Sequence, residues 1–238
     1  MSRGGALVTG AARGIGRGIA LALADDGYDV AVHYRSSASD AEAVCAEAAA
    51  GGMRSVAVQG DLTDDADAER VVLEAHAAVG PLRVLVNNVG NYLLVPLDEL
   101  TIAQWDEMLD SNLRATFVTC RTALPLLREA GGGHIVNLGY AGADDLVARP
   151  SVAAYAIAKT GVILLTKAIA KAEAGNRITA NVVAPGVIEN SDSKPLGEIP
   201  AGREGTIDEV AAAVRYLVSP AAAYVTGQVI ELAGGWNL

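Results

Sequence analysis

Short apolar runs alternate with longer helical patterns along this chain, and that alternation restricts the fold more than any other feature. We expect strands over residues 6–9, 29–34, 55–59, 84–87, 134–138, 178–184 and 228–232. We expect helices ending at residue 26 and over residues 38–50, 63–79, 97–129, 152–173 and 207–218. Strands joined through helices pair in parallel and carry helices on both faces of the sheet. The sequence therefore predicts an α/β fold with a doubly wound, parallel, seven-stranded sheet.

Length and composition fit a single domain over residues 1–238. The 238 residues are 51% hydrophobic, and no linker of the Pro/Ser-rich kind interrupts them. The most apolar stretch, 152–170, carries two lysines, so we expect a buried helix there rather than a membrane segment. The first apolar run is too short for a signal peptide, and only two cysteines are present. These features predict a cytoplasmic location.

The net charge and the small number of histidines and cysteines argue against several classes of partner. The net charge of −10 argues against nucleic acid and anionic membranes as partners. The three histidines and two cysteines show no metal-ligand spacing. We therefore expect no metal site.

Three glycines lie between the first expected strand and the helix after it. Gly10, Gly14 and Gly16 enclose Arg13 and Ile15. Glycines let a backbone turn tightly and approach a diphosphate, which the start of the following helix attracts. A glycine-rich turn can also occur without a ligand, but its place after the first strand favours a dinucleotide site.

The end of the second strand distinguishes the two nicotinamide dinucleotides. An NAD site usually places an acid about 20 residues beyond the glycines, where it bonds the ribose 2′-hydroxyl. Here the chain reads Tyr34-Arg35-Ser36-Ser37. Arg35 can bind a 2′-phosphate, Ser36 or Ser37 can donate to it, and Arg13 can supply a second cation. The alternative is two exposed surface arginines. We predict NADP(H) as cofactor.

Tyr155 and Lys159 stand four residues apart on an expected helix and so share one face. A phenol there is a candidate proton donor, and a neighbouring ammonium favours the phenolate and lowers the pKa of the phenol. An ordinary amphipathic helix also produces such a pair often. The pair becomes a candidate active site only together with the other motifs.

Several motifs in register resemble the classical short-chain dehydrogenase/reductase family. They are Thr9-Gly10-Ala11-Ala12-Arg13-Gly14-Ile15-Gly16, Asp61-Leu62, Asn87-Asn88-Val89-Gly90, Asn112, Tyr155-Ala156-Ile157-Ala158-Lys159, Pro185-Gly186 and Gly234-Gly235. The resemblance spans nearly the whole chain and implies one Rossmann-fold domain. Within the family, 3-oxoacyl-[acyl-carrier-protein] reductases are most similar, and pteridine reductases share the HYRSS turn.

The resemblance also implies roles for individual residues. Asp61 and Leu62 would hold the adenine, and Asn88, Val89 and Gly90 would line the ribose region. The backbone at Pro185, Gly186 and Ile188 would position the nicotinamide. Tyr155 would be the proton donor, Lys159 would lower its pKa and bind ribose, and Asn112 would hold a proton-passing water. From the residues alone, Asp61 can instead cap a helix, 87–90 can be a plain turn, and Asn112 can bond its own helix.

Position 140 departs from the family pattern. The family has a Ser there that donates a hydrogen bond to the substrate oxygen, whereas this chain has Tyr140. Tyr140 carries its hydroxyl on a longer, rigid arm. Ser151 is the next serine, and we expect it to be the N-cap of the following helix. Asp144 and Asp145 are near the acid that pteridine reductases use, but they do not align with it.

Two further features bear on the substrate. The loop over 187–199, which contains Glu189, Asp192 and Lys194, is shorter than in the acyl-carrier-protein reductases. An acidic protein suits an acidic carrier protein poorly unless local cations compensate. Arg114, Arg121 and Arg128 recur at seven-residue spacing and are candidates, although a solvated or interface edge is the simpler interpretation.

Three functions remain open on the sequence. The first is NADPH-dependent reduction of a small-molecule carbonyl, a 3-oxoacyl thioester or similar small ketone, possibly bound to a carrier protein. The second is reduction of a pteridine or another C=N bond. The third is an NADPH-binding scaffold or sensor with little turnover, because Tyr140 replaces the Ser. Broad apolar faces on the helices at 97–129 and 152–173 predict a homotetramer or homodimer.

Overall fold

Seven parallel strands form one sheet in the computed structural model, which describes residues 2–146, 148–191 and 194–236. The strands are β1 (Gly5–Val8), β2 (Asp29–Tyr34), β3 (Ser55–Gln59), β4 (Leu82–Asn87), β5 (Gly133–Leu138), β6 (Ile178–Pro185) and β7 (Val229–Leu232). Their order is β3-β2-β1-β4-β5-β6-β7. The predicted seven-stranded parallel sheet is confirmed.

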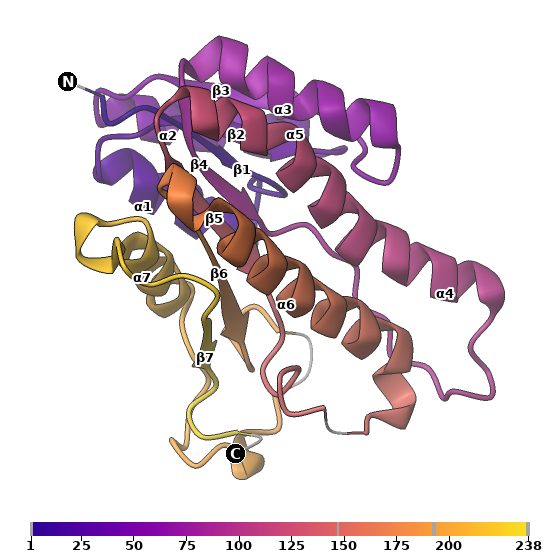
Figure 1. Cartoon of the computed structure of the whole chain (residues 1–238). Coiled ribbons are helices and arrows are strands. Elements are labelled where there is room, and N and C mark those ends of the chain that lie inside the picture. The colour runs from indigo at the N-terminus through magenta and orange to yellow at the C-terminus, as the bar shows by residue number, and fades with distance from the viewer. Residues whose placement is uncertain (1, 147, 192–193, 237–238) are drawn as a thin grey trace.

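Helices cover both faces of the sheet (Figure 1). The helices are α1 (Gly14–Asp25), α2 (Ala38–Ala50), α3 (Asp65–Val79), α4 (Ile102–Leu109), α5 (Ala115–Glu129), α6 (Ala153–Glu173) and α7 (Ile207–Leu217). One core packs α1, α2 and α7 against the sheet, and a second core packs α3, α5 and α6 against the opposite face. Val30 and Val32 face the first core and Ala31 the second, as the alternation along a strand requires.

The strand order reverses at β1, and this reversal positions the site. The chain runs from β1 outward to β3 and then returns to β4 on the other side of β1. The loops after β1 and β4 therefore diverge and leave a crevice at the carboxyl ends of these strands. Four loops that follow strands, 10–16, 35–37, 60–62 and 88–91, lie around this crevice.

The helix expected over 97–129 is wrong in two respects. It begins at Ile102, where Thr101 and Gln104 form a capping box. It is also interrupted by a π-helical turn, Asp110–Arg114, between α4 and α5. A π turn absorbs one extra residue inside an otherwise continuous helix, so the helical pattern over 97–129 did not reveal it.

Helix α6 covers β6 and is the longest helix described. The stretch Pro150–Asn176 is long and apolar enough to span a membrane by length and composition. In the structure, Ile163, Ile169 and Ala170 of this helix are buried against the sheet. The expected N-cap at Ser151 is wrong. Pro150 begins a 3-10 turn, which makes Val152 the N-cap residue and gives the helix no side-chain cap.

Candidate active site

The glycine loop between β1 and α1 takes the conformation that its glycines permit. Gly10 and Gly14 have φ values of 60° and 55°, in the left-handed region that disfavours larger residues. A Cβ on Gly16 would lie 2.4 Å from the carbonyl oxygen of Gly10. The Asn88 amide donates to the carbonyls of Thr9 (3.0 Å) and Gly10 (3.1 Å). The loop after β4 therefore holds the glycine loop in place.

His33 fixes the same loop from the other side, a role that the sequence did not reveal. Its Nδ1 accepts a hydrogen bond from the Gly10 N–H (3.0 Å), so its Nε2 donates to the carbonyl of Gly60 (3.1 Å). Burial lowers the pKa of His33 to about 4, and the ring is therefore neutral at pH 7. This single tautomer ties the end of β1 to the end of β3.

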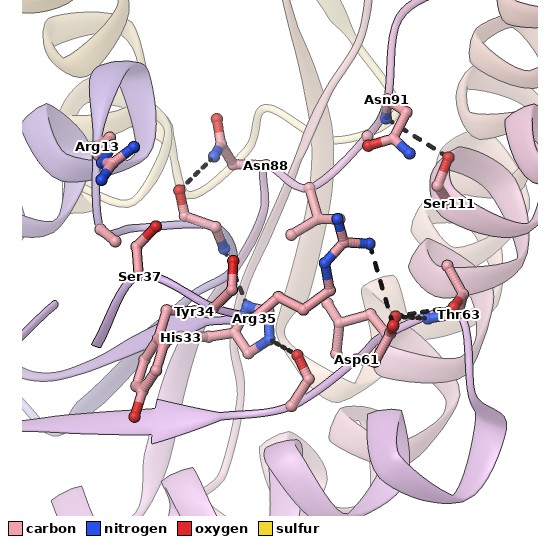
Figure 2. A pocket seen from close by; sticks show the side chains of 17 residues that line it. Arg13, His33, Tyr34, Arg35, Ser37, Asp61, Thr63, Asn88, Asn91 and Ser111 are labelled. Carbon is pink, nitrogen blue, oxygen red and sulfur yellow. Dashed lines mark hydrogen bonds and ion pairs between the residues drawn. The ribbon is translucent and has the colours of Figure 1, made fainter. Parts of the chain in front are cut away.

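A cleft of about 340 Å³ opens between these loops (Figure 2). Ten of the predicted cofactor residues line it: Gly10, Arg13, Tyr34, Arg35, Ser36, Asp61, Leu62, Asn88, Val89 and Gly90. His33, Thr63, Asn91 and Ser111 line it as well, and sequence reasoning gave them no role. The cleft thus brings together residues from five segments of the chain.

Two cations stand at the cleft where a 2′-phosphate would lie. Arg35 is 4.0 Å from Asp61, and Figure 2 shows its guanidinium turned toward that carboxylate. Arg13 pairs with Asp40 at 2.5 Å. Ser36 and Ser37 also line this end. No acid follows β2 directly, so the residues present fit a 2′-phosphate better than a free 2′-hydroxyl.

The remaining predicted cofactor residues support the cleft without lining it. Ile15 packs into the core beside α1. Gly186 donates its N–H to the carbonyl of Leu232, and Ile188 donates to the Ser191 hydroxyl. Pro185 accepts from the Ala141 N–H. The loop after β6 is thus held by β7 and by its own side chains, and residues 192 and 193, with the predicted Asp192, lie outside the described residues.

Asn112, Gly90 and Lys159 meet at the inner end of the cleft. The Asn112 amide nitrogen donates to the carbonyls of Met108 and Asn91, both at 3.0 Å. Its Oδ1 is buried and accepts no hydrogen bond from another described residue. A Cβ on Gly90 would lie 2.2 Å from this oxygen and 3.2 Å from Lys159 Nζ. Glycine at position 90 therefore leaves an acceptor free beside the lysine.

Tyr155 and Lys159 lie on one face of α6, as their spacing predicts. Lys159 Nζ is 5.7 Å from the Tyr155 ring centroid and donates to the Leu138 carbonyl at 2.8 Å. Burial lowers the pKa of Lys159 to about 8. The pKa of Tyr155 is raised, by burial and then by the phenols of Tyr140 and Tyr92. The lowered pKa expected for Tyr155 is therefore wrong in this arrangement, because burial disfavours the charged phenolate.

Comparison with known proteins gives the family. The family described as Enoyl-(Acyl carrier protein) reductase matches residues 10–237. The 3-oxoacyl-[acyl-carrier-protein] reductase of Staphylococcus aureus is 40% identical, covering 97% of this chain and 96% of its own length. The chain belongs to the short-chain dehydrogenase/reductase family. It is an oxidoreductase of the carbonyl/hydroxyl type.

Solved structures of short-chain dehydrogenases/reductases superpose over the whole chain. One from Serratia marcescens is 33% identical with a TM-score of 0.93, covering 100% of this chain and 99% of its own. A blue fluorescent protein from a metagenomic library, solved in complex with NADPH, is 34% identical with a TM-score of 0.92 and the same coverage. This likeness, together with the cleft, shows that the chain has the fold of nicotinamide-dependent family members.

Tyr140 occupies the position at which the family resemblance implies a Ser. Its ring meets the Tyr155 ring at a centroid distance of 5.3 Å. Tyr92 approaches Tyr155 in the same edge-on manner, at 5.0 Å. Burial raises the pKa of Tyr140, while the Arg149 cation lowers it. Tyr140 therefore lies beside Tyr155 with its hydroxyl still protonated at neutral pH.

The other charged residues considered for substrate or partner binding form ion pairs with neighbouring side chains. Asp144 pairs with Lys167 at 2.9 Å, and both side chains are largely exposed. Arg114 pairs with Asp65, and Arg121 with Glu69. Arg128 likewise holds Glu173. The three spaced arginines are thus neutralised by acids. No group of metal-ligating side chains gathers within residues 2–146, 148–191 and 194–236.

Proposed function

We propose that this chain is an NADPH-dependent reductase of small carbonyl compounds, acting on a 3-oxoacyl thioester or a similar small ketone. The observation that carries this proposal is the close approach of Asn112 and Lys159 to Gly90, which lines the dinucleotide cleft, with Tyr155 beside Lys159 on the same helix face. A binding protein would need none of these three side chains in this arrangement.

The cofactor preference rests on charge at the outer end of the cleft. Arg35 and Arg13 supply two cations, and Ser36 and Ser37 supply hydroxyl donors. A 2′-phosphate would compete with Asp61 and Asp40 for these arginines. A dianion with bidentate geometry binds a guanidinium more strongly than one exposed carboxylate does. NADP(H) is therefore the proposed cofactor.

Each residue at the inner end has a role in the proposed reaction. The bound nicotinamide would supply the hydride. Tyr155 holds its proton until charge develops on the substrate oxygen, because its raised pKa keeps the phenol neutral at pH 7. Lys159, one helical turn away, holds positive charge that favours release of that proton. Asn112 Oδ1 accepts beside the ammonium and can orient a proton-passing water.

Carrier-protein recognition is not supported by the paired arginines. Arg114, Arg121 and Arg128 each hold a carboxylate, so this edge presents little net positive charge to an acidic partner. We propose a free small-molecule substrate rather than a carrier-bound one. A cytoplasmic setting is proposed with it, since Cys45 and Cys120 are both free thiols.

A turnover panel tests the proposal. NADPH absorbance is followed with an acetoacetyl thioester, small diketones, quinones and a dihydropteridine. Oxidation with a ketone is expected, and Tyr155→Phe should remove it while the NADPH dissociation constant stays within about threefold. Turnover with the dihydropteridine alone would favour the pteridine alternative. NADPH binding without oxidation across the panel would favour the scaffold.

Assembly is proposed through the outer faces of α5 and α6. Phe117, Ile157 and Leu164 are 47%, 50% and 64% exposed on these helices. Large apolar side chains left open on neighbouring helices are typical of a subunit interface. A homodimer or homotetramer is expected by light scattering. A monomeric mass at micromolar concentration would contradict it.

A further inference from the structure

Arg149 presents an unpaired guanidinium beside the reacting centre. It lies on the loop between β5 and α6, and its guanidinium carbon is 5.1 Å from the ring centroid of Tyr140. Among the described residues, its buried Nε has no hydrogen-bond partner and no carboxylate forms an ion pair with it. Arg54 and Arg83 also hold no carboxylate, but each donates to a backbone carbonyl.

The acids nearest to Arg149 in the chain do not neutralise it. Asp144 is held by Lys167, and Asp145 is exposed to solvent. A buried guanidinium N–H without an acceptor costs free energy, and this chain carries ten more acidic than basic side chains. Leaving this cation unpaired is therefore unexpected unless an acceptor arrives with a ligand.

One aromatic ring, that of Tyr140, lies between the Arg149 guanidinium and Tyr155. Tyr140 separates it from Tyr155, with distances of 5.1 Å from guanidinium carbon to ring and 5.3 Å from ring to ring. A guanidinium that stacks on an aromatic face keeps its N–H edge free to bind an anion. The hydroxyls of Tyr92, Tyr140 and Tyr155 make no hydrogen bond to another described residue. The cluster thus places one cation close to the phenols of Tyr140 and Tyr155.

We propose that Arg149 binds an anionic group of the substrate, namely a carboxylate, while the substrate carbonyl lies at Tyr155. The substrate class is then a small oxo acid, a ketone that carries a carboxylate a few bonds from its carbonyl. This inference rests on the proposed carbonyl reduction and narrows it. Arginine pairs with a carboxylate through two parallel hydrogen bonds, so it selects this group over an ester or amide.

A matched pair of substrates tests the assignment in the holoenzyme. The probes are 3-oxobutanoate and its methyl ester, which differ by the negative charge. Arg149→Gln should lower kcat/KM for 3-oxobutanoate by roughly 10- to 100-fold, mainly through KM, because one charge-assisted pair is lost. The methyl ester should stay within about threefold. Arg54→Gln, which removes a positive charge at the edge of β3, should leave both substrates unchanged.

Three results would overturn the proposal. Equal loss on both substrates would mean that Arg149 acts only by supporting Tyr140. A wild-type preference for the ester would exclude a carboxylate site, as would an Arg149→Gln variant that reduces 3-oxobutanoate normally. Arg149→Lys should retain part of the preference for the acid, since it keeps the charge without the bidentate geometry.

The anion site can be separated from the carbonyl chemistry. If neither these probes nor any ketone of the turnover panel is reduced, the proposed function fails, and the site is then tested by calorimetry of 3-hydroxybutanoate binding to the NADP-loaded protein. If Arg149→Gln abolishes this binding, the anion site is supported independently of carbonyl reduction. Absence of binding to the wild-type protein would refute it.

Discussion

Tyr140 and Tyr155 meet edge to face, with ring centroids 5.3 Å apart and planes inclined by 69°. This contact places a second phenol beside Tyr155, where the family resemblance implies a short hydroxyl side chain. Tyr140 also contributes to the raised pKa of Tyr155. A change at position 140 is therefore expected to affect Tyr155 as well.

Removing the Tyr140 hydroxyl should slow the reaction and leave cofactor binding intact. Tyr140→Phe keeps the ring contacts with Tyr155 and Arg149 but deletes the donor. We expect kcat to fall by about 10²-fold, as for loss of one donor to a developing oxyanion. Tyr92→Phe is the matched control, because Tyr92 packs on Tyr155 from 5.0 Å. If the two variants behave alike, the Tyr140 hydroxyl has no special role.

Arg35 should determine the choice of dinucleotide. Arg35→Ala is expected to lower kcat/KM with NADPH by roughly 10- to 100-fold, the effect of a lost charge-assisted bond. The value with NADH should change by less than threefold. Arg17→Ala removes a comparable exposed arginine, which pairs with Glu47 on the adjacent surface. An unaltered ratio of the two cofactors in Arg35→Ala would contradict the phosphate assignment.

Gly90 should tolerate no side chain. In Gly90→Ala the new methyl would lie 2.2 Å from Asn112 Oδ1, so Asn112 or the loop after β4 must move. We expect kcat to fall at least tenfold and the free energy of unfolding to drop by about 1–3 kcal/mol. Gly175→Ala is the control, since a Cβ there meets nothing within 4 Å. Activity in Gly90→Ala equal to that of Gly175→Ala would show that Asn112 is not needed in its present position.

Stability should decrease with acid between pH 6.5 and pH 4 because of His33 and His134. The folded chain keeps both rings neutral down to pKa values of about 4, whereas the unfolded chain protonates them near pH 6.5. The unfolded state therefore binds more protons in this window, and each histidine lowers the free energy of unfolding by up to roughly 3 kcal/mol as pH drops through it. Urea unfolding at several pH values measures the slope.

His33→Asn should remove part of that slope, and the part due to His134 should remain. The same His33→Asn variant should bind NADPH more weakly at pH 7, because the Gly10 N–H loses the acceptor that orients the glycine loop. A slope identical to wild type would mean that other groups dominate the acid response.

Local patterns predicted much of this molecule. The glycine loop and the Tyr155–Lys159 pair depend on short spacings, so sequence alone places them. The roles of His33 and Arg149 depend on contacts with residues that only the folded sheet brings near, Gly60 for the first and Tyr140 for the second. The direction of the Tyr155 pKa shift also required the fold, because it depends on how deeply the phenol is buried. Sequence spacing specifies neighbours along a helix, but not how much water they lose.

The π turn at Asp110–Arg114 carries one residue more than regular helical geometry needs, and Asn112 sits in its middle. Deleting a residue next to Asn112 from this turn would let α4 and α5 join as a regular helix, and the side chain at position 112 would then point in another direction. Asn112 would then leave Gly90 and Lys159 although no residue of the site had been changed. Among working relatives, chain length in this window should vary far less than amino-acid identity.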